Sequence, residues 1–202
     1  FSILMERAHE PGKRKAILSE ATRLFAEKGF HATSVADVVA RLDMPVGSVY
    51  TYFKSKDDII RSAIDEGWDD FYDALLAACA AAPGPVAKLE VLVGSFLPDL
   101  LEKTDFVALI LSEGLRFTDL RDKVERLAEL IGSILRDLAR ERGVNLNLSP
   151  RQYQTALSVF FLGMLDTVRL SKLAGLALTE RDVLSFIHSM VQNAFKVDIG
   201  NL

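Results

Sequence analysis

Apolar residues recur at helical spacing along almost the whole chain, and this periodicity restricts the possible folds more than any other feature. In the segment 13–28, for example, apolar side chains three or four residues apart share one helical face: Ile17, Ala21, Leu24 and Phe25. Signs of β-strands are almost absent, since there are no alternating runs of valine, isoleucine and threonine and no Asn-Gly hairpin turns. We therefore predict an all-α protein of about nine helices.

Caps and helix breakers give the expected helix boundaries. Gly29 is suited to end the first helix, Thr33 or Ser34 to begin the second, and Pro45 to occupy the first turn of the third. The tetrapeptide APGP is the clearest break in the chain. The expected helices are 13–28, 34–42, 45–53, 55–81, 86–102, 105–116, 119–142, 150–174 and 180–196.

The chain divides by charge as well as by helix length. We assign residues 1–54 to a small three-helix domain and residues 55–202 to a larger helical body. Up to Ile60, nine lysines and arginines face eight acidic residues, whereas the remainder carries fifteen against twenty. The net charge of −4 therefore belongs mainly to the body, and a local basic face remains possible on the small domain.

Composition indicates a globular protein of the cytoplasm. Half of the 202 residues are hydrophobic, which excludes a disordered chain. Cys79 is the single cysteine, so no intrachain disulfide can form, and we expect it to be buried. The longest uncharged apolar stretch, 152–165, is shorter than the about 20 residues that a membrane span requires. The first residues lack an apolar segment followed by a cleavage site, so we expect a cytoplasmic location.

The two short helices 34–42 and 45–53, with the tight break Asp43-Met44 between them, fit a helix-turn-helix. Helices this short are marginal alone and must pack on the first helix. The outward face of the second is small or hydroxylated, as a helix lying in the major groove of DNA requires: Val46, Gly47, Ser48, Thr51 and Tyr52. On spacing alone, an ordinary three-helix subdomain with an exposed polar helix is an equal alternative.

The segment from Ile17 to Ile60 closely resembles the N-terminal domain of TetR-family transcriptional repressors. The matching residues are Leu24-Phe25, Gly29-Phe30, Thr33-Ser34, Gly47, Val49-Tyr50, Tyr52-Phe53 and Lys56. The resemblance implies a homodimer whose two small domains bind a pseudo-palindromic operator. We expect no cofactor and no metal. The residues expected to contact DNA are Thr33, Ser34, Arg41, Pro45, Val46, Gly47, Ser48, Tyr50, Thr51, Tyr52, Lys54 and Lys56.

Within that set we expect two roles. Tyr52 and Lys56 would anchor phosphates, while Val46, Ser48 and Thr51 would face bases. Two positions depart from the family pattern. Asp43 replaces the usual glycine of the turn, but aspartate tolerates the left-handed conformation better than most residues. Pro45-Val46 replaces a pair that is often polar, which predicts a different operator and not a loss of DNA binding.

The resemblance also implies that the body binds a small effector, which releases DNA, and dimerises through its last two helices. An apolar stripe on 180–196 and the nearly all-apolar helix before it support dimerisation, with ordinary core packing as the alternative. The expected interface residues are Phe161, Leu165, Val183, Phe186, Ile187, Met190, Val191 and Ala194.

The expected ligand site combines apolar residues with polar groups stranded in apolar stretches. The candidates are Trp68, Phe71, Phe96, Phe106, Leu109, Glu113, Phe117, Phe160, Met164, Asp166 and Arg169. Structural ion pairs or the rim of a dimer are the alternative reading of the charged members. The mostly apolar list favours a hydrophobic or amphipathic effector.

An enzyme and a helical adaptor are the two alternatives to a DNA-binding regulator. An enzyme is disfavoured because His9, His31 and His188 lie far apart without metal-ligand spacing, and because phosphate-loop and nucleophile-elbow motifs are absent. A helical adaptor without a DNA role is the other alternative, and salt-dependent duplex binding would separate the two. We therefore predict a ligand-responsive transcriptional regulator, most simply a repressor, with DNA, a small effector and a second copy of the chain as its partners.

Overall fold

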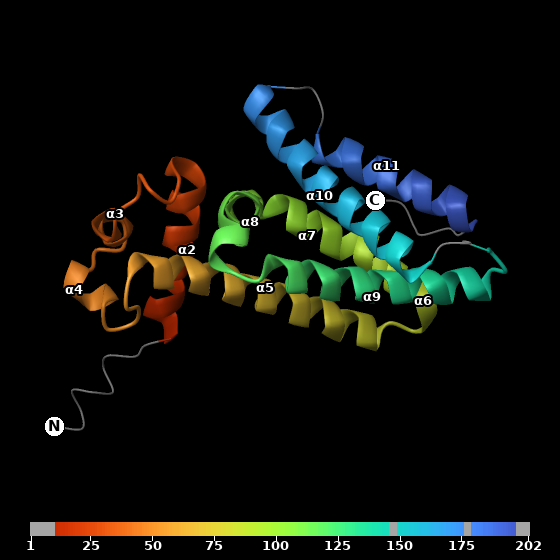
Figure 1. Ribbon diagram of the computed structural model, residues 1–202, viewed down its shortest axis with the longest axis horizontal. Coiled ribbons are helices and arrows are strands. Elements are labelled where there is room, and N and C mark those ends of the chain that lie inside the picture. The colour runs from red at the N-terminus through yellow and green to blue at the C-terminus, as the bar shows by residue number, and fades with distance from the viewer. Residues whose placement is uncertain (1–10, 146–148, 176–178, 197–202) are drawn as a thin grey trace. The chain divides into compact units, whose positions relative to one another are not determined.

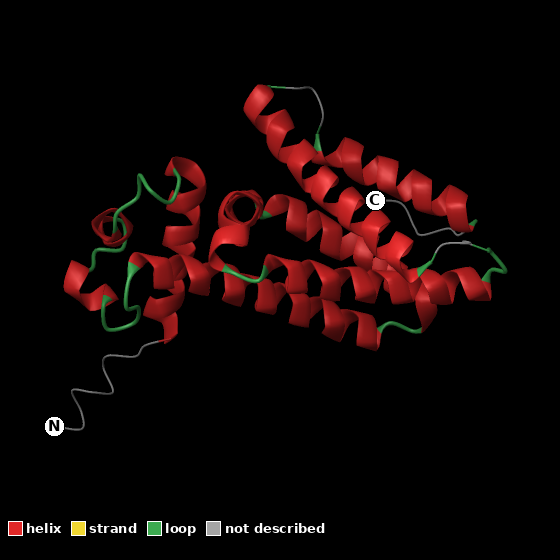
Figure 2. Ribbon diagram, viewed as in Figure 1, coloured by secondary structure: helices red, strands yellow, loops and turns green. Residues whose placement is uncertain are grey.

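The computed structural model describes residues 11–145, 149–175 and 179–196, and within these ranges every regular element is a helix (Figure 2). The prediction of an all-α fold is confirmed. None of the described helices combines the length and the apolar character needed to cross a membrane.

Contacts group the chain into two compact units. Unit 1 comprises the described residues up to Asp69 together with Asp105–Asp119, and unit 2 comprises Asp70–Thr104 and the described residues from Leu120 onward. The division runs through one long helix, α5, and separates the helix α8 from the elements on either side of it. The functional boundary expected after residue 54 stays a prediction.

Unit 1 contains the helix-turn-helix and the elements that pack on it (Figure 1). Its helices are α2 (Pro11–Lys28), α3 (Val35–Ala40), α4 (Val46–Val49), the first half of α5 (Lys56–Ala81) and most of α8 (Thr104–Phe117). The small core expected from the sequence is confirmed, because these side chains are all buried: Leu24, Phe25, Phe30, Val38, Val49 and Phe53. Arg14 of α2 and Glu66 of α5 join these two helices through a bidentate ion pair that is partly exposed.

Helix α4 is shorter than the expected 45–53. Beyond Val49 the chain continues in hydrogen-bonded turns, with the amides of Tyr52 and Phe53 both donating to the Val49 carbonyl at 2.9 and 3.0 Å. A glycine and two β-branched valines in one turn give the segment weak helix propensity. The expectation of a nine-residue helix is therefore wrong in length, although the helix lies where it was expected.

Unit 2 is a bundle of helices. After the end of α5 it contains α6 (Gly84–Val91), η1 (Leu92–Phe96), α7 (Leu97–Glu102), α9 (Leu120–Glu141), α10 (Pro150–Ala174) and α11 (Glu180–Phe195). Helix α10 packs against both α9 and α11 (Figure 1). Cys79 is buried here as expected, and burial raises the pKa of its thiol.

The expected helix 86–102 is continuous but contains a π turn. Pro98 has no amide hydrogen to donate to the carbonyl of Gly94, four residues before it. The amide of Leu97 instead donates to the carbonyl of Leu92, five residues back. Such π turns occur mostly as single widened turns and are frequent at functional sites.

Three helices begin with reciprocal capping boxes. In α3 the hydroxyl of Ser34 accepts from the Asp37 amide at 3.1 Å, and the Asp37 carboxylate accepts from the Ser34 amide at 2.7 Å. The same arrangement opens α10 and α11, where Thr179 is the expected cap. Hydrogen bonds from the Ser34 hydroxyl and then from its amide lower the pKa of Asp37.

This cap predicts a pH-dependent contribution to stability. Because the folded pKa of Asp37 lies below its unfolded value of about 3.9, the cap stabilises α3 above that value and is lost as pH falls through the folded pKa. Thermal unfolding should therefore find the wild type more stable than Asp37→Asn at pH 7, with the difference shrinking towards pH 3. A difference that stayed constant over this range would contradict the assignment.

Candidate nucleic-acid interface

The turn between α3 and α4 depends on a left-handed aspartate. Asp43 has φ +50°, as the sequence led us to expect, and the amides of Leu42 and Met44 both donate to the Val39 carbonyl at 2.9 and 3.4 Å. This geometry reverses the chain within three residues. It packs α4 directly on α3, which is the arrangement of a helix-turn-helix.

The face of α4 that points away from this core carries small side chains, and the larger Tyr50 follows directly after the helix. Val46 is 41% exposed and Tyr50 is 55% exposed, while Gly47 and Thr51 are also exposed. Ser48 and Tyr52 are half-buried. Hydroxyls, a methyl-bearing valine and a glycine on one short helix provide hydrogen-bonding and apolar contacts of the kind that read base edges in a major groove.

Nothing in the protein itself explains Gly47. A Cβ atom built at this position would meet no other atom within 4 Å, and the residue does not adopt a positive φ. A glycine inside a helix nevertheless costs about 1 kcal/mol relative to alanine. The close approach of another molecule to the backbone of α4 would account for that cost.

The turn between α2 and α3 uses its hydroxyls internally. Thr33 is only 1% exposed, and its hydroxyl oxygen lies 3.0 Å from the Gly29 carbonyl and 3.2 Å from the Leu24 carbonyl. Ser34 is exposed, but its hydroxyl takes part in the α3 capping box. Both residues were expected to contact DNA, and in the structure the hydroxyl of each also forms hydrogen bonds that hold the turn.

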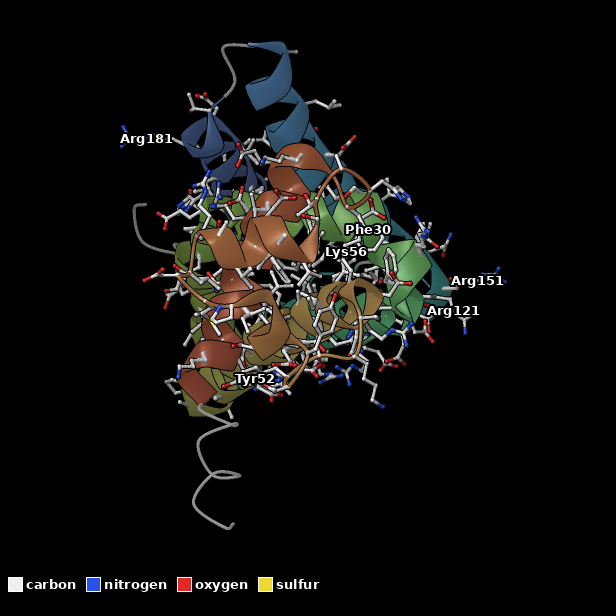
Figure 3. All side chains as sticks on the ribbon, turned by 90° about the vertical axis from the view of Figure 1, so that its left-hand side faces the viewer. Phe30, Tyr52, Lys56, Arg121, Arg151 and Arg181 are labelled. Carbon is white, nitrogen blue, oxygen red and sulfur yellow. The ribbon has the colours of Figure 1, made fainter. Side chains whose placement is uncertain are left out.

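Lys56, the first residue of α5, also contacts this turn. Its ammonium donates to the carbonyls of Phe30 and Thr33 at 2.8 and 2.9 Å and lies 4.3 Å from the centre of the Phe30 ring (Figure 3). Three further residues of the expected DNA-contact set are exposed: Arg41, Pro45 and Lys54.

Phe30 joins the turn to a distant helix. Its ring lies 5.4 Å from that of Phe25 and 4.8 Å from that of Phe117, at the end of α8. The Arg116 guanidinium, which can only donate, lies 2.7 Å from His31 Nε2, which accepts in the tautomer that carries its hydrogen on Nδ1. Local sequence patterns could not reveal this contact, because the two residues are 85 positions apart.

Unit 2 contains an apolar cavity of about 500 Å³ that is partly open to solvent, since its lining residues Phe160 and Met190 are exposed. Side chains from α6, η1, α7, α9, α10 and α11 surround it, and all of them are apolar: Leu89, Leu92, Val93, Phe96, Leu97, Ile131, Leu135, Ala156, Leu157, Phe160, Met164, Ile187, Met190, Val191, Ala194 and Phe195. Its size falls in the usual range for small-molecule sites, about 300–1,000 Å³.

The structure brings some of the expected ligand residues together at this cavity and places others elsewhere. Phe96, Phe160 and Met164 line it, and Phe71 packs behind Phe96 with ring centres 3.9 Å apart. Asp166 lies further along α10 and is not in the lining, and the side chain of Arg169 is outside the described residues. The remaining candidates belong to unit 1: Trp68, Phe106, Leu109, Glu113 and Phe117.

The expected dimer residues occupy two sides of α11. Phe186 is 63% exposed and Met190 and Ala194 are also exposed, whereas Ile187 and Val191 are buried within unit 2. Val183 is half-buried beside Phe186 in a second depression, of about 540 Å³, between α10 and α11. The side chains of Phe161 and Leu165 are outside the described residues.

The site contains no evident metal centre in the part of the chain that the structure describes, since no three histidine, cysteine or acidic side chains there cluster closely enough to hold an ion. The geometry of α3, its turn and α4 is that of a helix-turn-helix, an arrangement that recurs in DNA-binding domains.

Comparison with known proteins agrees with this class. Residues 17–63 match the family described as bacterial regulatory proteins, tetR family, and this segment belongs to that family. The uncharacterized HTH-type transcriptional regulator YuxN of Bacillus subtilis (strain 168) is 29% identical over 120 residues, which are 59% of this chain and 40% of that protein. The matches to the first two curated relatives span 40% and 36% of their lengths, less than half in each case.

Solved structures resemble the fold over nearly the whole chain. A transcriptional regulator from Saccharomonospora viridis in complex with choline has a TM-score of 0.72 and 19% identity, covering 91% of this chain and 97% of that one. The regulator FadR from Bacillus subtilis in complex with stearoyl-CoA has a TM-score of 0.67 and 18% identity, covering 90% and 97%. Similarity at this level of identity establishes the fold.

The left-handed turn residue predicts opposite effects of two substitutions. Asp43→Gly should raise the free energy of unfolding by up to about 1 kcal/mol, because glycine adopts a positive φ without a steric cost. Asp43→Val should lower it by about 1–2 kcal/mol, because a β-branched residue at that φ is strained. Urea unfolding monitored by circular dichroism measures both, and three equal midpoints would contradict the role given to Asp43.

Proposed function

We propose that this chain is a ligand-responsive DNA-binding regulator of transcription that acts as a repressor. It binds a pseudo-palindromic operator as a homodimer and releases it when a small hydrophobic or amphipathic effector occupies unit 2. The observation that carries the proposal is the bare, open face of α4, with Gly47 at its centre, on a domain of the tetR family.

The DNA contact is proposed for the face formed by Val46, Gly47, Ser48 and Thr51. The Ser48 hydroxyl can exchange hydrogen bonds with base edges, and the Val46 methyl groups suit the methyl group of thymine. Lys54 and Arg41 are exposed cations on the same domain and are placed at phosphates. Half-sites one turn of DNA apart, about 34 Å, would match the two-fold symmetry of a dimer.

The dimer contact is proposed for the outward faces of α10 and α11. Val159 and Phe186 are among the most exposed large apolar side chains of the described residues, and Phe160 and Met190 are partly exposed beside them. A Cβ atom at Gly163 would meet open space, so another helix could approach α10 closely there. Burying this apolar strip against the same strip of a second copy would satisfy two-fold symmetry.

The effector site is proposed for the cavity of unit 2. Because every lining residue among those that the structure describes is apolar, the buried part of the effector is expected to carry no charge and no hydrogen-bonding group. The π turn contributes Leu92, Val93 and Phe96 to the wall, which places an irregular and therefore adaptable turn against the ligand. The two solved relatives hold very different ligands, choline and stearoyl-CoA, so the fold alone does not select the effector.

DNA recognition can be tested by selecting random duplexes with the purified protein over a salt series. The wild type should recover an inverted repeat, and binding should weaken steeply as salt rises. Gly47→Leu should then lose operator affinity by about 100-fold or more, because a side chain would block the approach of the backbone, while removing a helical glycine leaves stability equal or up to about 1 kcal/mol higher.

Gly94→Leu is the matched control for this test. Gly94 is an exposed helical glycine of unit 2 whose Cβ would also meet open space. It should keep full operator affinity. If Gly47→Leu bound the operator as tightly as the wild type, the assignment of the α4 face to DNA would be wrong.

Effector binding can be tested with N-phenyl-1-naphthylamine, an uncharged fluorescent probe. The wild type should bind it saturably, and Val93→Trp, which fills the cavity, should weaken binding by about tenfold or more. Leu115→Trp adds the same bulk at a side chain that is 84% exposed in unit 1 and should leave the titration unchanged. Equal affinities for the wild type and Val93→Trp would remove the cavity as the effector site.

A further inference from the structure

We propose that Lys56 is a positioning residue for DNA binding, which holds the turn between α2 and α3 and does not neutralise a phosphate. The inference rests on the proposed DNA-binding function and revises the role that the sequence suggested for this lysine. The contacts of the ammonium group within unit 1 indicate this role.

The Lys56 ammonium is occupied on two sides. Two of its three protons reach backbone carbonyls, those of Phe30 at 2.8 Å and Thr33 at 2.9 Å. The face of the Phe30 ring lies 4.3 Å from the nitrogen, within the range of a cation–π contact (Figure 3). The side chain is half-buried, whereas Lys54, two residues earlier, is exposed.

The carbonyls that Lys56 holds lie at the two ends of one turn. Phe30 follows the last turn of α2, and Thr33 directly precedes Ser34, the cap of α3. The Thr33 hydroxyl fastens the same turn from the inside through Gly29 and Leu24. Lys56 closes it from the other side, so the turn is fixed by a hydroxyl within the core and by an ammonium at its rim.

The direction of α3 follows from this turn, and α4 packs on α3. A relaxed turn would therefore tilt the face of α4 that carries Val46, Gly47 and Ser48. Reading a sequence requires that face to be aligned with base edges, whereas non-specific attraction to phosphates requires only charge. Loss of the Lys56 ammonium should consequently reduce discrimination between sequences more than it reduces general affinity for DNA.

The test compares Lys56→Met with Lys54→Met on two duplexes, the selected operator and a scrambled sequence, over a salt series. Both variants remove one positive charge from the same segment, so the long-range loss of charge is common to them. Methionine also keeps an unbranched stem over the Phe30 ring. Circular dichroism establishes that each variant is folded at the temperature of the titrations.

Lys54→Met removes a proposed phosphate contact and should lower both affinities together and reduce the salt slope by about one. Lys56→Met should instead bind the operator about tenfold more weakly than the wild type, with scrambled-duplex affinity within about twofold of the wild type and a salt slope that is not smaller. If Lys56→Met instead lowered both affinities together and reduced the slope by about one, as expected for Lys54→Met, Lys56 would be a phosphate contact and the proposal would be overturned. An unchanged ratio of operator to scrambled affinity would overturn it as well.

If Lys56→Met does not fold, Lys56→Gln takes its place, and the outcome is judged from the same two quantities: the ratio of operator to scrambled affinity and the salt slope. The failure of this inference is distinguishable from the failure of the proposed function. If the wild type shows no sequence preference, both proposals are overturned. If the wild type is selective but Lys56→Met lowers both affinities together and reduces the salt slope, only the positioning role is overturned.

Discussion

The packing around the Phe30 ring is the contact on which the arrangement of unit 1 depends. The ring touches the aromatic side chains of Phe25 and Phe117 and carries the Lys56 ammonium on its face. Three helices, α2, α5 and α8, therefore meet at a single side chain just after the end of α2. Aromatic rings contribute both large buried area and directional contacts, so one residue can define how these helices approach each other.

This packing makes most of α8 a member of unit 1, which contains the helix-turn-helix. The chain enters α8 from unit 2 and leaves it for α9, yet most of its residues cluster with the helix-turn-helix. At the first turn of the helix, Phe106 lies against Gly67 of α5 so closely that a Cβ there would come within 2.5 Å of the ring. Both ends of α8 are thus fixed to unit 1 by aromatic side chains, Phe106 and Phe117.

Features encoded by neighbouring residues could be predicted from the sequence. The helices, the caps at Ser34 and Thr179, and the left-handed Asp43 follow from local propensity and backbone sterics. Features that depend on distant residues could not. The use of the Lys56 ammonium at two carbonyls and the Arg116–His31 contact join segments 23 or more positions apart, and no periodicity carries that information. Likewise, three of the expected ligand residues line the cavity while five belong to the other unit, because helical spacing gives a face and not a neighbour.

The π turn at Leu92–Phe96 has a consequence for the register of its helix. A turn closed by a bond to the fifth residue contains one residue more than an α-helix would, and each residue advances the helix by about 100°. The surplus residue therefore rotates everything after it, and it allows Leu97, Leu100 and Leu101 to face the core together with Leu89 and Leu92 before it. Relatives that lack the π turn would align with this chain only across a one-residue gap. Deleting a single residue here would turn α7 by about a quarter of a revolution while leaving its composition intact.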